Sequence, residues 1–124
     1  MNDLPDESGR PDVPLTVRRE DRDSCRVFTL DGDVDIETSR VLREQLMDGL
    51  TATDRVVVDF SDVGFMDSTG LGAVVGAWRV VRDDGAFVIA GARDVVVQVL
   101  SVAGLKKLFT LEDDVDRAVA AATA

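Results

Sequence analysis

The chain is 124 residues long, which suits one domain and is too short for two. Its 24 acidic and 14 basic residues give a net charge of −10, the wrong sign for neutralising the phosphates of DNA or RNA, so we expect no nucleic-acid partner. There is no histidine and only one cysteine, which excludes a Ser-His-Asp or Cys-His triad, a histidine phosphorelay and an ordinary zinc site.

Residues 1–14 differ from the rest of the chain in composition. They hold all three prolines with four acids and one base, and they show no hydrophobic periodicity. Such a segment buries too little apolar surface to fold, so we predict a disordered acidic leader at 1–14 and one domain at 15–124. The leader lacks the features of a signal peptide, and no stretch reaches the ~18 apolar residues of a membrane span. With the single Cys25, which cannot form an internal disulfide, this predicts a cytoplasmic protein that does not insert into membranes.

The first half of the domain region changes from a strand period to a helical period. Residues 15–19 and 25–30 have strand patterns, and the polar segment 20–24 between them predicts an N-terminal hairpin. Residues 38–49 repeat apolar side chains at helical spacing. Residues 56–60 are a nearly continuous β-branched run, which is typical of a central strand covered on both faces.

The second half continues the alternation of helices and strands. We predict a helix at 70–82, a strand at 86–90, a helix at 94–103, a strand at 107–111 and a helix at 112–122. The order is therefore β-β-α-β-α-β-α-β-α. Alternating strands and helices need crossover connections, so the predicted fold class is α/β, with a mostly parallel central sheet and an N-terminal edge hairpin strand.

The junction between the strand at 56–60 and the next helix has more polar residues than helix capping requires. The strand at 56–60 and a turn at 61–66 are followed by Asp67, Ser68 and Thr69, which open a helix. These are preferred residue types for capping the free N–H groups of a first helical turn. One cap is enough, however, and the three polar residues are followed by two glycines that cost helix stability. Spacing alone favours capping, and a special role stays open beside it.

A hydroxyl at position 68 has a physical use as a phosphorylation site. A phosphate adds about −1.5 to −2 charge and three acceptor oxygens. The helix N-terminus favours such an anion, whereas Asp67 and the net charge of −7 on residues 15–124 oppose it. We therefore expect the fold to survive phosphorylation and a docked partner to be released. Gly72 and Gly76 would let a partner approach α-helical backbone closely, or they could pack tightly on the chain's own sheet.

The same segment resembles a known family. Residues 56–60 and 63–72 resemble the signature of STAS domains, specifically that of the bacterial anti-sigma factor antagonists. The resemblance extends upstream to residues 30–35, which are similar to the family's acidic glycine turn after its second strand. It covers about residues 15–120 and implies a single STAS-like domain without enzymatic activity.

The resemblance implies a switch between two partners. In that family the Ser or Thr after the motif Asp is phosphorylated by a serine kinase that is also an anti-sigma factor; the unphosphorylated antagonist binds the kinase and frees the sigma factor, and a serine phosphatase restores it. Carried over, the acceptor is Ser68, with Thr69 as a secondary candidate. No catalytic residue, metal or cofactor is implied, and we expect a monomer or weak dimer. The implied partner-binding residues are Asp31, Gly32, Asp33, Asp35, Met66, Asp67, Ser68, Thr69, Gly70, Leu71 and Gly72.

Two other kinds of site, a dinucleotide site and a phosphoaspartate site, are alternative interpretations of residues in this chain. The spacing G-x-G-x-x-x-G at residues 70–76 suggests a dinucleotide site, but Asp67 would face the pyrophosphate and the second nucleotide-binding half is missing. A two-component receiver domain would use Asp59 with Lys106 or Lys107, but the N-terminal hairpin conflicts with the parallel start of that fold. A solvated or turn-capping role is the favoured interpretation of Asp59.

Two further alternatives concern the acidic loop and the family role. Asp31, Asp33 and Asp35 are spaced like the start of a calcium loop, but Ile36 replaces the required Gly and Leu42 the bidentate Glu, which favours a solvated turn. Within the STAS resemblance, a stressosome-type scaffold or a partner of a lipid or anion transport system is the alternative to a sigma-factor role.

Overall fold

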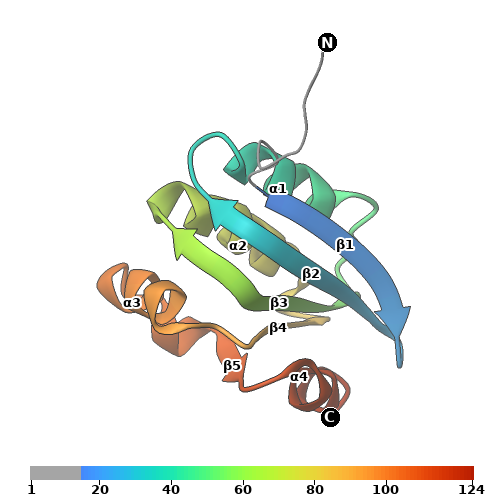
Figure 1. The fold of residues 1–124 in the computed structure, drawn as a ribbon. Helices are drawn as coiled ribbons and strands as arrows, with labels where there is room; N and C mark the ends of the chain where they lie inside the picture. The colour runs from blue at the N-terminus through green and yellow to red at the C-terminus, as the bar shows by residue number, and fades with distance from the viewer. Residues whose placement is uncertain (1–14) are drawn as a thin grey trace.

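The computed structural model describes residues 15–124, and the leader predicted at 1–14 lies outside the described residues (Figure 1). The described chain forms one five-stranded sheet in the order β1-β2-β3-β4-β5, with four α-helices. The elements are β1 (Leu15–Arg22), β2 (Cys25–Val34), α1 (Ser39–Met47), β3 (Arg55–Met66), α2 (Ser68–Val81), β4 (Ala86–Ala90), α3 (Asp94–Val102), the 3₁₀ helix η2 (Lys106–Leu108), β5 (Thr110–Glu112) and α4 (Val115–Ala122).

The sheet has the predicted topology. β1 pairs antiparallel with β2 at the edge, while β2, β3, β4 and β5 pair parallel. The hairpin turn is tighter than the predicted segment 20–24, because Asp23 and Ser24 take positive φ values of 50° and 70° and close the loop with two residues. The α/β class, the element order and the N-terminal edge strand are confirmed.

Helices cover the two faces of the sheet unequally. Helices α1, α2 and α3 pack on one face over the larger core, whose fully buried members include Phe28, Phe60 and Leu100. Helix α4 alone packs on the other face, where it covers a smaller cluster that includes Cys25 and Val57. The molecule is therefore a three-layer α/β unit, and α1 and α2 lie behind the sheet in the view of Figure 1.

Several predicted boundaries are wrong. The strand predicted at 25–30 continues to Val34, so most of the acidic glycine turn expected at 30–35 is strand, and the helix predicted at 112–122 begins only at Val115 because Glu112 pairs with Ala90. The turn predicted at 61–66 is strand, because these residues keep pairing with β2 as far as the contact of Met66 with Val34 and need two shifts of register to do so. The strand predicted at 107–111 starts too early: Lys107 and Leu108 lie in the 3₁₀ helix η2, and the strand that pairs with β4 is Thr110–Glu112. Gly104, with a φ of 74°, ends α3 and turns the chain before it can extend.

Candidate functional site

The predicted site lies where β2 and β3 end and α2 begins. Val34 pairs with Met66 at the last register position of the two strands. The N–H of Asp67 then donates to the carbonyl of Val34 over 3.1 Å, which fixes the start of α2 against the end of β2. The carboxyl ends of two parallel strands and a helix N-terminus therefore meet at Asp67, which is a common place for binding sites in α/β folds.

Capping accounts for Asp67 and Thr69. Asp67 is the N-cap of α2, and its Oδ1 accepts the backbone N–H of Thr69 over 2.9 Å. The Thr69 hydroxyl donates to the same carboxylate oxygen. Both residues thus satisfy groups of the helix start, as the simplest interpretation of the sequence predicts.

Capping does not account for Ser68. Its side chain is exposed as the first residue of α2, and within residues 15–124 its hydroxyl has no hydrogen-bond partner. The Thr69 hydroxyl, by contrast, is half-buried and held by Asp67. Of the two predicted phosphate acceptors, Ser68 is the one that a second protein can reach without breaking a bond within this chain.

The glycines of α2 serve different purposes. A Cβ added to Gly70 would lie 2.6 Å from Val34 Cγ1 and 3.0 Å from Met66 Cγ, so Gly70 lets the helix start approach the sheet. A Cβ at Gly72 would meet only the Arg43 side chain at 3.5 Å, and one at Gly76 would meet nothing within 4 Å. Gly72 and Gly76 therefore do not pack on the sheet, which overturns the packing interpretation for that pair.

An apolar groove of about 430 Å³ runs between α2 and α3 and reaches Ser68. Val102 at its edge is 82% exposed. The sequence predicts α3 but does not connect it with the site. The available signal was a second apolar stripe at positions 95, 99 and 102, beside the stripe of Val96 and Leu100 that enters the core. The lining residues are Ser68, Leu71, Val95, Gln98, Val99, Val102 and Ala103.

The acidic loop residues lie beside the site on β2. Asp31 pairs with Asp62, and Asp33 with Phe65, so both exposed carboxylates flank the end of β3. Between them Gly32 has a φ of 127°, a conformation that L side chains rarely adopt, at one of the two register shifts. The strand pairing thus brings the predicted acidic loop next to the helix start.

Asp35 has a structural task in the same loop. Its carboxylate accepts the N–H of Thr38 over 3.0 Å and that of Glu37 over 2.9 Å. These bonds, with the one from Thr38 the strongest, lower the pKa of Asp35. Asp35 organises the turn into α1 and lies on the same end of the sheet as Ser68.

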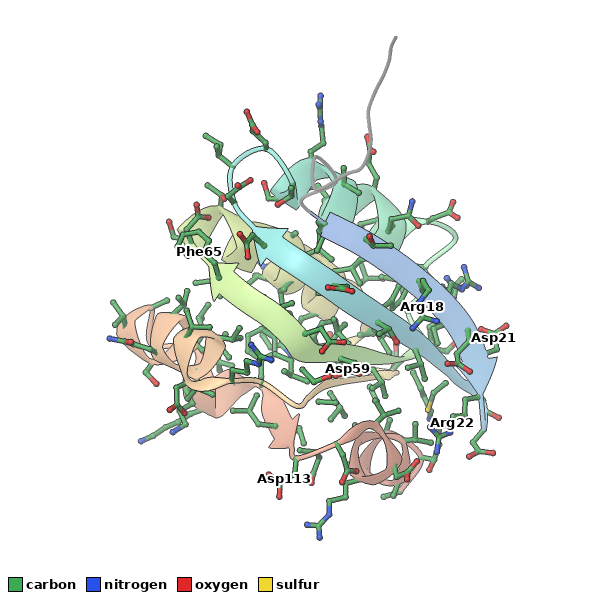
Figure 2. All side chains as sticks on the ribbon, viewed as in Figure 1. Arg18, Asp21, Arg22, Asp59, Phe65 and Asp113 are labelled. Carbon is green, nitrogen blue, oxygen red and sulfur yellow. The ribbon has the colours of Figure 1, made fainter. Side chains whose placement is uncertain are left out.

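Three other residues of the predicted partner-binding set lie in the interior. Met66, Gly70 and Leu71 are buried, at the junction of β3 and α2. From the interior, they pack under the exposed residues of the site. Phe65, which the sequence analysis did not single out, is 46% exposed at the end of β3 (Figure 2). An aromatic side chain exposed three residues before Ser68 is a ready contact for a second protein.

The described residues do not form the receiver-type aspartate site or the metal site that were considered as alternatives. The carboxylate of Asp59 accepts the N–H of Ser61 over 3.0 Å inside β3, beside a shift of register with β2, so it serves an irregular strand and not the turn that the sequence predicts there. Lys106 lies in η2, after the end of α3. Among residues 15–124 no group of three His, Cys, Asp or Glu side chains is placed to hold a metal ion.

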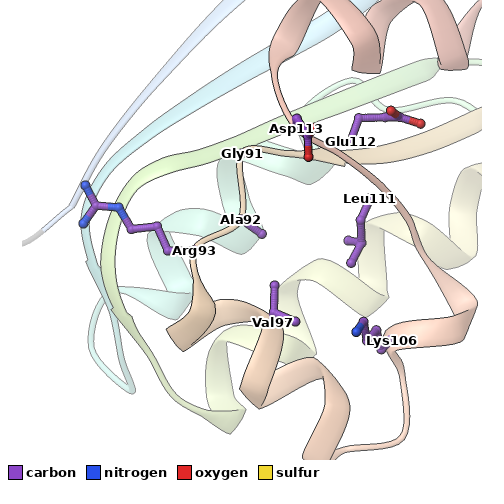
Figure 3. A pocket seen from close by; sticks show the side chains of 8 residues that line it. All are labelled: Gly91, Ala92, Arg93, Val97, Lys106, Leu111, Glu112 and Asp113. Atoms are coloured by element: carbon purple, nitrogen blue, oxygen red, sulfur yellow. The ribbon is translucent and has the colours of Figure 1, made fainter.

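A second hollow of about 350 Å³ lies at the carboxyl ends of β4 and β5 (Figure 3). Side chains of both signs surround it, with Lys106 on one side and Glu112 and Asp113 on the other, while Arg93 extends away from it. None of the predicted site residues lines this hollow. It is separate from the groove at Ser68.

Comparison with known proteins identifies the family. The family model described as the STAS domain matches residues 16–118. The chain belongs to the STAS domain family. It is 25% identical over 107 residues to the anti-sigma-B factor antagonist of Listeria monocytogenes, with 82% of this chain and 90% of that protein covered.

Two solved structures extend this comparison. The crystal structure of an anti-sigma factor antagonist from Mycobacterium paratuberculosis superposes with a TM-score of 0.83 at 24% identity, covering 94% of this STAS domain chain and all of that one. SpoIIAA, a Bacillus cell fate determinant in its phosphorylated form, gives a TM-score of 0.64 at 20% identity, covering 86% of this chain and 98% of that one. Within residues 15–124, no helix is both long enough and apolar enough to span a membrane.

Proposed function

We propose that this STAS domain is an anti-sigma factor antagonist that is switched by phosphorylation of Ser68. The observation that carries the proposal is the state of Ser68 itself. It is an exposed hydroxyl without a partner in the described chain, it stands at a helix N-terminus, and Asp67 and Thr69 beside it complete the cap without its help.

The phosphoryl transfer would come from the partner. In the proposed reaction the Ser68 oxygen attacks the γ-phosphorus of ATP bound to an anti-sigma factor kinase. The new O–P bond forms as the bond to ADP breaks, and the hydroxyl proton passes to a base on the kinase. A serine phosphatase would hydrolyse the phosphoserine with water and return inorganic phosphate and the free hydroxyl.

The surface around Ser68 supports docking of the kinase in the unphosphorylated state. On one side is the apolar groove between α2 and α3, and on the other is the exposed Phe65 flanked by Asp33. On the outer face of α2 the backbone at Gly76 is open, and the only side chain near a Cβ at Gly72 would be that of Arg43. Apolar and aromatic anchors near the centre of a patch are the usual source of binding energy in protein interfaces.

Phosphorylation would weaken this docking for two reasons. The phosphate adds about −1.5 to −2 charge beside Asp67, in a chain whose net charge is already −10. It also places a solvated group at the mouth of the apolar groove, where docking has to remove water. A combined cost of about 3 kcal/mol lowers affinity by about a hundredfold, which is enough for a switch.

The test is a pull-down from the native lysate with ADP present, in which captured proteins are identified by mass spectrometry. The bait proteins are the unmodified chain, Ser68→Ala, Ser68→Asp and the matched control Ser24→Asp. Ser24 is exposed in the β1–β2 turn, at the other end of the sheet, where its positive φ is tolerated by Asp.

The proposal expects a sigma-binding kinase on the unmodified chain, on Ser68→Ala and on Ser24→Asp, and its loss on Ser68→Asp. Equal capture by all four baits would contradict the switch. Capture of transport-system subunits or scaffold proteins in place of a kinase would contradict the sigma-factor role.

A further inference from the structure

Arg43 stands out because the site described so far does not use it. It lies on α1, and its Nη2 is 3.5 Å from the position that a Cβ at residue 72 would occupy. No other side chain comes within 4 Å of that position, so the guanidinium lies over the bare backbone of α2. Within residues 15–124 Arg43 forms no ion pair with a carboxylate.

Helix geometry places this guanidinium near the start of α2. Residues 68 and 72 are one turn apart and share a helix face. The Cα–Cβ bond of a helical residue tilts toward the helix N-terminus, so the Cβ position at residue 72 lies over the turn that begins with Ser68. The Arg43 guanidinium, next to that position, therefore lies above the turn that carries the Ser68 hydroxyl.

We propose that Arg43 is the intramolecular receptor for the phosphate on Ser68. This inference rests on the proposed phosphorylation of Ser68. A phosphoserine offers three acceptor oxygens, and the planar guanidinium can donate two parallel N–H bonds to them. The pair joins α1 to α2 across Gly72, where a longer side chain would stand between the two groups.

The pairing changes what phosphorylation does to the docking surface. Asp67 repels the phosphate from one side, and Arg43 attracts it toward the outer face of α2. The phosphate then lies along the Ser68–Gly72 face rather than extending into solvent. The phosphate and the guanidinium that it holds then cover the Ser68–Gly72 face together, so release of the partner has a steric cause in addition to charge.

The experiment is a ³¹P NMR titration of the full chain with phosphoserine incorporated biosynthetically at position 68. The apparent second pKa of the phosphate is compared in the wild-type sequence, Arg43→Gln, Arg43→Lys and Arg79→Gln. Arg79 is the matched control: it is exposed on the same face of α2, three turns from Ser68 and about 16 Å away.

If Arg43 holds the phosphate, Arg43→Gln raises that pKa by about 0.5 unit or more, because the dianion loses its cationic partner. Arg43→Lys retains part of the effect, and Arg79→Gln leaves the pKa within about 0.2 unit. If the second pKa of the phosphate in Arg43→Gln equals that in the wild type, the proposal is overturned. A change of equal size in Arg79→Gln would overturn it as well, since the effect would then come from net charge alone.

A second readout protects the test against a general structural effect. The ¹⁵N resonance of Arg43 Nε should shift between the unmodified and phosphorylated wild-type chains while that of Arg79 stays in place, and a stationary Arg43 resonance contradicts the pairing. Both measurements use the isolated phosphorylated chain without a kinase. If no kinase is captured in the pull-down, the proposed function is contradicted. The NMR result still decides independently whether Arg43 pairs with the phosphate.

Discussion

The inner and outer faces of the first turns of α2 are built on opposite principles. On the inner face Gly70 exists because nothing larger fits, with Val34 2.6 Å from where its Cβ would be. On the outer face a Cβ at Gly72 would meet only the Arg43 guanidinium, at 3.5 Å, and one at Gly76 would meet nothing, although glycine within a helix costs up to about 1 kcal/mol relative to alanine. Packing explains the first glycine and leaves the other two without a reason inside the molecule.

The same division holds for the polar residues of the turn. Asp67 and Thr69 bond to each other and complete the helix start, whereas Ser68 between them bonds to nothing in the described chain. We therefore assign Asp67 and Thr69 to folding and Ser68 to contact with a second protein. Substitutions on the two sides of that division test it separately.

The largest effect is expected at Gly70. Gly70→Ala places a methyl group against Val34 and the Met66 side chain, and overpacking of this kind costs about 2 kcal/mol. Thermal unfolding followed by circular dichroism should show a melting temperature several degrees below that of the wild type. An unchanged melting temperature would mean that the helix start is not tightly seated.

A smaller effect, on binding alone, is expected in the groove. Val102→Asp introduces a charge at the groove edge, where the side chain is 82% exposed, so stability should stay within about 0.5 kcal/mol of the wild type. Affinity for the anti-sigma partner should fall about tenfold or more, measured by calorimetry.

The control for the groove is Val41→Asp. Val41 is 41% exposed on α1 and does not line the groove. It should bind the partner like the wild type. Equal weakening by both variants would show that added charge acts at long range, and the groove would lose its assigned role.

Gly76→Ala should act in opposite directions on folding and docking. With nothing within 4 Å of the added methyl group, the free energy of unfolding should rise, by at most about 1 kcal/mol. Urea denaturation measures this gain, and calorimetry measures any loss of partner affinity from the raised helix surface. A lower free energy of unfolding in Gly76→Ala would show instead that Gly76 is required for packing within the chain.

The smallest effect is a pH dependence at Asp35. Hydrogen bonds from Thr38 and Glu37 lower the pKa of the folded-state carboxylate below its unfolded value of about 3.9. Its stabilising contribution is therefore complete above pH ~3.9 and is lost as the pH falls through the lowered pKa. In Asp35→Asn the decrease in stability between neutral and acidic pH should be smaller than in the wild type. Midpoints of urea denaturation at the two pH values measure this decrease. A variant with the wild-type slope would contradict the assignment.

Most of the fold could be predicted because its signals are local. The β-branched run of β3, the change to helical spacing in α1 and the glycine after α3 each determine an element without knowledge of the rest. The prediction of a turn at 61–66 is wrong because the strand character of this segment comes from pairing with β2, including two register shifts that leave no mark in the sequence of β3 alone. Likewise η2 depends on the turn at Gly104 and not on the propensity of its own residues.

The site could be predicted only where its chemistry is contiguous in sequence. Asp67, Ser68 and Thr69 are neighbours, so the sequence alone leads to the phosphorylation hypothesis. The groove and Arg43 were not, because they depend on how α3 and α1 approach α2 in space. An apolar stripe on α3 could have indicated a second covered surface, but no local pattern says which helix it faces.

The central claim is that the charge on Ser68 sets the affinity of this STAS domain for its anti-sigma partner. The most direct measurement is calorimetric titration of the partner kinase, with ADP bound, against the unmodified chain and the chain carrying phosphoserine at position 68. The account predicts a dissociation constant about a hundredfold weaker for the phosphorylated chain. Equal dissociation constants for the two forms would contradict it.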